Sequence, residues 1–195
     1  MNELLPLWLK ITYSAYVAVT LCVYWFKYGP ANYLWFSDIA LILTVPALWL
    51  ESSSLTSMML LAVLLPEILW NIGFFSGLLT GKPAGGLADY MFNRSLPLYL
   101  RGLSLFHIFL PLLLVWMVVT LGYDERALLW QTLLAWIVLP LSYLISDSKE
   151  NVNWVYGPGL KAQRHLPPLT YLALLMLGFP LLIYLPTHWF FLFLG

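Results

Sequence analysis

Long apolar stretches separated by short polar connections dominate the chain. Crossing the hydrocarbon core of a bilayer as a helix takes about 20 mostly apolar residues. None of the stretches alternates polar and apolar residues over about ten positions, as the strands of a membrane barrel do. Because backbone groups in lipid must be satisfied internally, the pattern predicts membrane-spanning helices. The six predicted helices cover approximately residues 8–27, 33–50, 55–79, 102–121, 127–146 and 166–193.

The composition agrees with this pattern. Of the 195 residues, 62% are hydrophobic and 9% are charged, whereas a soluble domain carries about 25% charged residues. We therefore predict an all-α integral membrane protein: one transmembrane domain over residues 1–195, a six-helix bundle kinked by interior prolines. The formal net charge is zero, so no nucleic-acid partner is expected.

The basic residues predict how the bundle is oriented. Cytoplasmic connections of membrane proteins carry an excess of lysine and arginine. Only Lys10 and Arg126 fall on the side of the two termini. The termini are therefore predicted to be non-cytoplasmic. The opposite, cytoplasmic side holds Lys27, Lys82, Arg94, Arg101, Lys149, Lys161 and Arg164.

Three ionisable side chains, Asp38, Glu67 and His107, lie inside predicted spanning helices, where a charge is costly and usually functional. At a rise of about 1.5 Å per residue, Asp38 and His107 lie about 8 Å below the cytoplasmic boundary and Glu67 about 18 Å. Asn71, one turn from Glu67, shares its helix face at a depth of about 12 Å. Because these groups share one half of the membrane, we predict a polar cavity open to the cytoplasmic leaflet.

His107 precedes an interior proline by four residues. Pro111 has no N–H, so the carbonyl of His107 loses its helical partner, and protein groups or water must satisfy it. Ser104 lies three residues before His107, and Trp70 lies three residues after Glu67. Each of these side chains therefore shares a helix face with its neighbour.

These residue types suit acid–base chemistry. We predict His107 as the general base, Asp38 as its orienting partner or a second acid–base group, and Ser37 as a candidate nucleophile. The competing interpretation is that these groups only hydrogen-bond neighbouring helices. The predicted substrate-binding residues are Glu67, Asn71, Trp70 and Asn153.

No cofactor is predicted, but one metal alternative stays open. Asp38, Glu67 and His107 have side chains of the types that bind zinc or iron. No paired metal-binding motif accompanies them.

The connection over residues 147–165, the most polar part of the chain, contains the sequence "NWVYGPG" from Asn153 onward. Its glycine and proline residues predict a structured turn rather than a flexible tether. We expect this turn to cap the predicted cavity as a lid.

Two segments, roughly residues 28–48 and 102–159, resemble the androgen-induced membrane hydrolases. "HIFLPLLLV" from His107, a further apolar helix and then "NWVYGPG" are similar to the C-terminal half of that family. The resemblance implies an intramembrane hydrolase with a comparable number of helices that cleaves lipid esters with a threonine nucleophile and a histidine, here His107. The position of the family's threonine holds Trp35 in this chain. The residues matching the start of a family helix are Tyr33, Leu34, Phe36 and Asp38.

Together, these observations predict a membrane enzyme that hydrolyses a lipid ester or a similar apolar substrate, with membrane lipid around it. The alternative is a non-enzymatic small transporter or ligand-binding membrane protein that uses the same buried carboxylates. A third hypothesis is a structural subunit whose polar residues only link helices.

Overall fold

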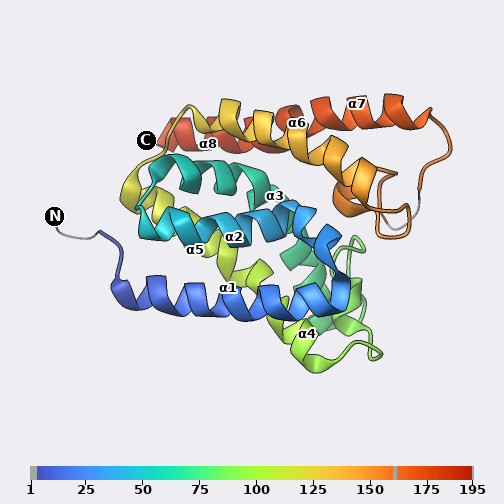
Figure 1. Ribbon diagram of the computed structural model, residues 1–195, viewed down its shortest axis with the longest axis horizontal. Coiled ribbons are helices and arrows are strands. Elements are labelled where there is room, and N and C mark those ends of the chain that lie inside the picture. The colour runs from blue at the N-terminus through green and yellow to red at the C-terminus, as the bar shows by residue number, and fades with distance from the viewer. Residues whose placement is uncertain (1–3, 160–161, 195) are drawn as a thin grey trace.

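The computed structural model describes residues 4–159 and 162–194, and it is helical throughout its regular elements (Figure 1). Lys161, one of the basic residues used to predict the orientation, lies outside the described residues. The α-helices are α1 (Leu7–Tyr28), α2 (Phe36–Trp49), α3 (Ser53–Thr80), α4 (Leu98–Leu103), α5 (Phe106–Leu121), α6 (Ala127–Ile145), α7 (Pro168–Gly178) and α8 (Leu185–Leu194). Short helical segments join them: η1 (Pro30–Leu34), η2 (Asp89–Phe92), η3 (Val152–Trp154) and the π-helical η4 (Phe179–Tyr184).

Five helical stretches of the described chain are long and apolar enough to cross a membrane, so the prediction of a multi-pass helical membrane protein is confirmed at that level. They are Leu7–Tyr28, Ser53–Thr80, Leu98–Leu121, Ala127–Ile145 and Pro168–Leu194. The predicted helix over residues 33–50 is shorter than expected. Its first residues form η1, and α2 has 14 residues, or about 21 Å at 1.5 Å per residue.

The helices run back and forth along one axis, and both described ends of the chain lie at the same end of the bundle (Figure 1). Helix α3 is central, because it packs against α2, α5 and α6. One apolar core joins α1, α2, α3 and α5, and a second joins α6 with the C-terminal helices. Helix α2 thus returns the chain to the starting end, although it is short.

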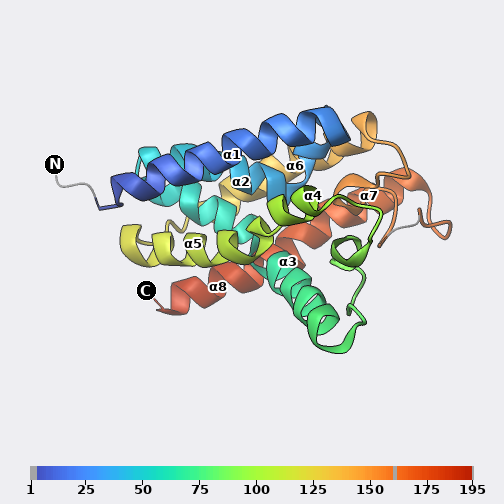
Figure 2. The same ribbon diagram turned by 90° about the horizontal axis from the view of Figure 1, so that it is seen from below.

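The segment between α3 and α4 folds back against α3. In Figure 2 the C-terminal half of α3 leaves the bundle at an angle, and the following segment runs back toward α4. Two glycines of α3 allow this close approach. A Cβ at Gly73 would lie 2.7 Å from the carbonyl oxygen of Ala84, and one at Gly77 would overlap the ring of Phe92. Trp70, Ala88 and Met91 form a small buried cluster there.

Candidate functional site

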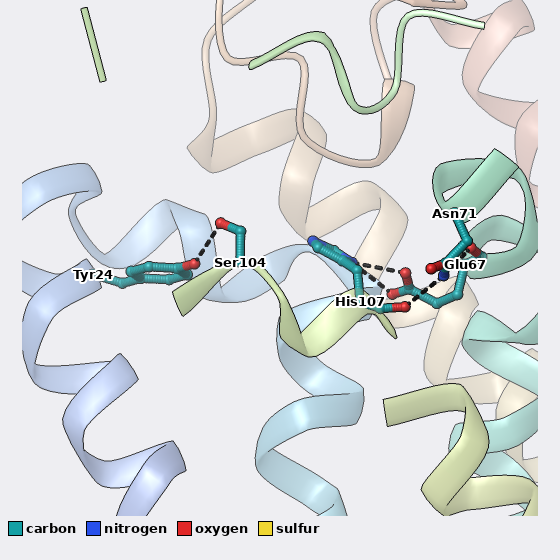
Figure 3. Close-up of polar contacts among 5 residues, drawn as sticks. All are labelled: Tyr24, Glu67, Asn71, Ser104 and His107. Carbon is teal, nitrogen blue, oxygen red and sulfur yellow. Dashed lines mark hydrogen bonds and ion pairs between the residues drawn. The ribbon is translucent and has the colours of Figure 1, made fainter. Parts of the chain in front are cut away.

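The candidate site centres on a hydrogen-bonded carboxylate–imidazole pair between α3 and α5. The Nδ1 atom of His107 lies 2.7 Å and 2.9 Å from the two carboxylate oxygens of Glu67 (Figure 3). The Glu67 side chain is 2% exposed and the His107 side chain 14%. A carboxylate this deeply buried is normally paired, and here the imidazole is its partner.

The helix is interrupted just before His107, and Pro111 leaves the His107 carbonyl without its helical partner. The helix breaks at Ser104 and Leu105, and the N–H of His107 donates to the carbonyl of Ser104 at 3.3 Å. The His107 carbonyl accepts a hydrogen bond from Nδ2 of Asn71 at 2.7 Å. That amide nitrogen also donates to the Glu67 carbonyl at 2.8 Å. Asn71, predicted to bind substrate, therefore donates to the carbonyl that Pro111 leaves without its helical partner.

Two aromatic rings flank the imidazole. The ring centroid of Trp70 lies 4.6 Å from that of His107, with 25° between the planes. Phe106 stacks on the same imidazole at 4.1 Å and 29°. An imidazolium formed during a reaction is attracted to such π faces. The packing also fixes the plane of the ring while Glu67 holds Nδ1.

A pair of hydroxyl groups belongs to Tyr24 and Ser104. The two hydroxyls are 3.0 Å apart, and in the view of Figure 3 they lie on the side of His107 opposite Glu67. Ser104 also donates to the carbonyl of Leu100 at 3.2 Å. The sequence argument placed Ser104 on the face of His107 but missed Tyr24. The signal for it is a buried stripe along α1 at helical spacing, formed by Lys10, Tyr13, Val17, Thr20 and Tyr24.

Asp38 does not orient His107, because the carboxylate that meets the imidazole belongs to Glu67. Asp38 is 5% exposed, and its Oδ2 accepts a hydrogen bond from Nδ2 of Asn32 at 3.3 Å. Its Oδ1 is buried and has no hydrogen-bond partner among the described residues.

The remaining predicted site residues lie elsewhere. Asn153 ties the start of α2 to α6: its Oδ1 accepts from the N–H of Phe36 at 3.0 Å, and its Nδ2 donates to Leu34 and Ser142. Its turn is structured, as predicted, but its contacts are with α2 and α6 rather than with His107. Ser37 is half-buried, and within the described chain its hydroxyl makes no hydrogen bond to His107.

Two surface hollows of the described chain are apolar and lie away from the predicted polar cavity. One, of about 330 Å³, lies between α1 and α5 and is lined mainly by apolar and aromatic side chains. Another, of about 500 Å³, lies along α1 next to Tyr33. Neither is lined by Glu67, His107 or Asp38.

The described residues contain no group of three histidine, cysteine, aspartate or glutamate side chains placed to hold a metal ion. Asp38, Glu67 and His107 therefore do not form the ligand set of the metal alternative. Glu67 is held by the imidazole instead.

Comparison with known proteins returned no match to a family model, a curated protein or a solved structure.

The chemistry available at this site follows from the pair itself. A carboxylate that accepts from Nδ1–H fixes the tautomer in which Nε2 carries the lone pair. Nε2 of His107 makes no hydrogen bond to a described residue, and the side chain is not fully buried. The Glu67–His107 pair thus has the carboxylate–imidazole arrangement of a general base with its orienting group.

Proposed function

We propose that this chain is an integral membrane enzyme in which the Glu67–His107 pair acts as a general base to hydrolyse an ester bond in a lipid-like substrate. The observation that carries the proposal is the hydrogen-bonded contact between Nδ1 and a Glu67 carboxylate that is 2% exposed. Ionisable groups at membrane depth are rare, and function is their default explanation. The resemblance to the androgen-induced hydrolases points to the same histidine.

Water is the nucleophile in this proposal. Ser37 makes no hydrogen bond to His107 within the described chain, and the threonine position of the resembling family holds Trp35. The Ser104 hydroxyl is engaged by Tyr24 and Leu100. Nε2 of His107 takes a proton from water as the water oxygen bonds to the ester carbonyl carbon. The tetrahedral intermediate then breaks its bond to the alkoxy oxygen, which receives the proton from Nε2. The products are a carboxylic acid and an alcohol.

The proposal includes six crossings with both termini on the non-cytoplasmic side. Both described ends lie at one end of the bundle, which requires α2 to cross between α1 and α3 (Figure 1). At about 21 Å, α2 is shorter than the hydrocarbon core of about 30 Å. Local thinning of the bilayer accommodates such a mismatch at modest cost. Its polar flanks Asp38 and Glu51 fit a crossing of that length.

The test is hydrolysis of lipid esters by purified protein in detergent or nanodiscs. Glu67→Gln keeps a hydrogen-bonding side chain but removes its charge, and His107→Gln removes the base. We expect both variants to lose at least about 100-fold in kcat. His188→Gln is the matched control. This histidine is buried in the C-terminal helix α8 and hydrogen-bonds the phenol of Tyr123 instead of a carboxylate. Equal turnover by all variants contradicts the proposal.

One observation favours a second candidate, a proton-coupled carrier. The buried Oδ1 of Asp38 has no partner among the described residues, so an ionised Asp38 would be costly unless a proton or a ligand joins it. Such a carboxylate suits a group that is loaded and unloaded during transport. Solute-driven proton flux in proteoliposomes that disappears in Asp38→Asn, with no ester hydrolysis, would establish this function instead.

A further inference from the structure

A buried hydrogen-bond donor beside His107 has no partner. The indole of Trp70 stacks on the imidazole and is 5% exposed, yet its Nε1 has no hydrogen-bond acceptor among the described residues. The N–H of a buried tryptophan usually finds a partner, and leaving one unmade costs about 1–3 kcal/mol. Such a donor in contact with a general base is suited to an oxygen that arrives with the substrate.

Tyr90 brings a second donor to the same place. Tyr90 lies in η2, and the segment around η2 packs closely on α3 at Gly73 and Gly77. The centroid of the Tyr90 ring lies 6.4 Å from that of Trp70. The side chains of Ser104 and Trp70 lie within reach of its phenol, but the indole N–H completes no hydrogen bond to it. Burial raises the pKa of Tyr90, so the phenol keeps its proton and stays a neutral donor. The hydroxyl therefore lies near both Trp70 and Ser104.

The charges around these donors select against an anion. The charged groups that act on the Tyr90 phenol are Glu67 and Asp38, and both are acidic. The donors themselves, an indole N–H and a phenol, are neutral. Arg101 donates to the carbonyl of Met91 through one guanidinium nitrogen at 3.1 Å, and its buried Nε has no partner among the described residues. A neutral carbonyl oxygen suits these neutral donors, whereas a phosphate would be repelled by the buried Glu67 carboxylate beside His107.

We infer that the Trp70 N–H and the Tyr90 hydroxyl form the donor site for the carbonyl oxygen of an uncharged lipid ester. The inference rests on the proposed hydrolysis and adds to it the substrate class and the groups that stabilise the transition state. As water attacks, the carbonyl electron pair moves onto this oxygen, and the two donors stabilise the developing negative charge. Donors held in place before the reaction are most effective in such a water-poor site.

Trp70→Phe tests the donor because phenylalanine keeps an aromatic ring for stacking on His107 while removing the N–H. We expect kcat for a neutral long-chain ester to fall about 100- to 1,000-fold, with KM changed less than about threefold. In Tyr90→Phe we expect kcat for the same ester to fall about 10- to 100-fold, since the site retains the indole donor. Trp136→Phe is the control, because its Nε1 donates to the Met176 carbonyl on the other side of the bundle. It should leave kcat unchanged.

Binding gives a readout that needs no turnover. A long-chain alkyl methyl ketone with a 13C-labelled carbonyl cannot be hydrolysed, and its infrared carbonyl band reports hydrogen bonding. We expect the band to shift to lower frequency in the wild-type protein and to lose most of that shift in Trp70→Phe. Tyr90→Phe provides the same comparison if Trp70→Phe does not fold.

The outcomes separate the two proposals. A shifted ketone band without hydrolysis of any ester overturns the proposed function and leaves the donor site standing. Hydrolysis undiminished in both variants, with an unshifted ketone band, overturns the donor site. A preference for an anionic phospholipid ester over a neutral diacylglycerol or wax ester overturns the uncharged substrate class and points to Arg101 as the headgroup contact.

Discussion

Two histidines of this chain make hydrogen bonds of the same length in different surroundings. His107 meets the Glu67 carboxylate at 2.7 Å, between α3 and α5. His188 meets the Tyr123 hydroxyl at 2.7 Å, at the end of the bundle where the termini lie (Figure 1). A carboxylate stabilises an imidazolium, whereas a neutral phenol orients the ring without supplying charge. The contrast shows that the partner, rather than burial or bond length, makes one of the two suited to proton transfer.

The carboxylates at the two places differ in the same way. Glu67 and Asp38 are buried among helices, and Asp38 keeps an oxygen without a partner in the described chain. Near the termini, Glu51 accepts from the N–H groups of Leu4 and Leu5 and from Lys10, and Asp124 pairs with Arg126. The carboxyl groups of Glu67 and Asp38 are buried at an energetic cost. Those of Glu51 and Asp124, near the termini, are hydrogen-bonded and paired with basic side chains. Selection for stability alone explains only the second arrangement.

The largest expected effect separates the two histidines by stability. His107→Ala leaves the buried Glu67 carboxylate without its partner, which costs about 3–5 kcal/mol of unfolding free energy. His188→Ala leaves a neutral phenol unpaired, which costs about 1–3 kcal/mol. Denaturant unfolding of the purified variants in the same detergent measures both values. Equal losses would mean that the Glu67 charge is not held by His107.

The hydrogen bond from Asn71 gives the next largest effect. Asn71→Ala leaves the His107 carbonyl unpaired, and we expect a loss of about 1–3 kcal/mol. Pro111→Ala restores a backbone N–H four residues after that carbonyl, so it should remove much of the cost when combined with Asn71→Ala. A double-mutant cycle of unfolding free energies measures this coupling. Strict additivity would show that the Pro111 position is not the reason for the bond.

The hydrophobic pattern predicted most of this fold, because long apolar stretches locate helices within a few residues. The effect of Pro111 was also predictable, because proline has no N–H and therefore leaves the carbonyl of His107, four residues earlier, without its helical partner. The partner of His107 was missed because depth was counted from residue 102. The apolar helical stretch begins at Leu98 rather than at residue 102, so His107 lies deeper along it than the expected depth of about 8 Å.

Direction around the helix was the other missing quantity. Depth along an axis does not say which way a side chain points, so Asp38 and His107 at matched depth had no reason to meet. The hydrogen bonds by which Asn153 joins α2 to α6 were not predicted. They depend on its left-handed backbone, at φ 52°, which the conformation of the whole turn determines. Tyr24 was detectable, since its buried stripe repeats at helical spacing.

A smaller effect tests whether the segment after α3 completes the site. Gly77→Ala places a Cβ into the Phe92 ring, so that ring must move and its packing in the segment carrying Tyr90 must change. We expect a loss of about 1–3 kcal/mol from overpacking, together with reduced ester hydrolysis. Gly178→Ala is the matched control, because a Cβ there meets no atom within 4 Å. Limited proteolysis between α3 and α4 should become faster only in Gly77→Ala.

The smallest expected effect concerns Glu51, the hydrogen-bonded carboxylate near the termini. Hydrogen bonds from the Leu5 N–H, Lys10 and the Leu4 N–H lower the pKa of Glu51 from about 4.5 to about 2. A lowered pKa stabilises the fold above the unfolded value and loses that contribution as the pH falls through the folded value. Glu51→Gln should therefore lower the Tm slightly at pH 7, and the difference from wild type should shrink between about pH 4.5 and pH 2. Thermal unfolding in detergent at a series of pH values measures this difference in Tm. Ester hydrolysis should stay unchanged, since Glu51 lies near the termini and away from the Glu67–His107 pair. A difference in Tm that persists at pH 2 would mean that Glu51 acts there through packing rather than through its charge.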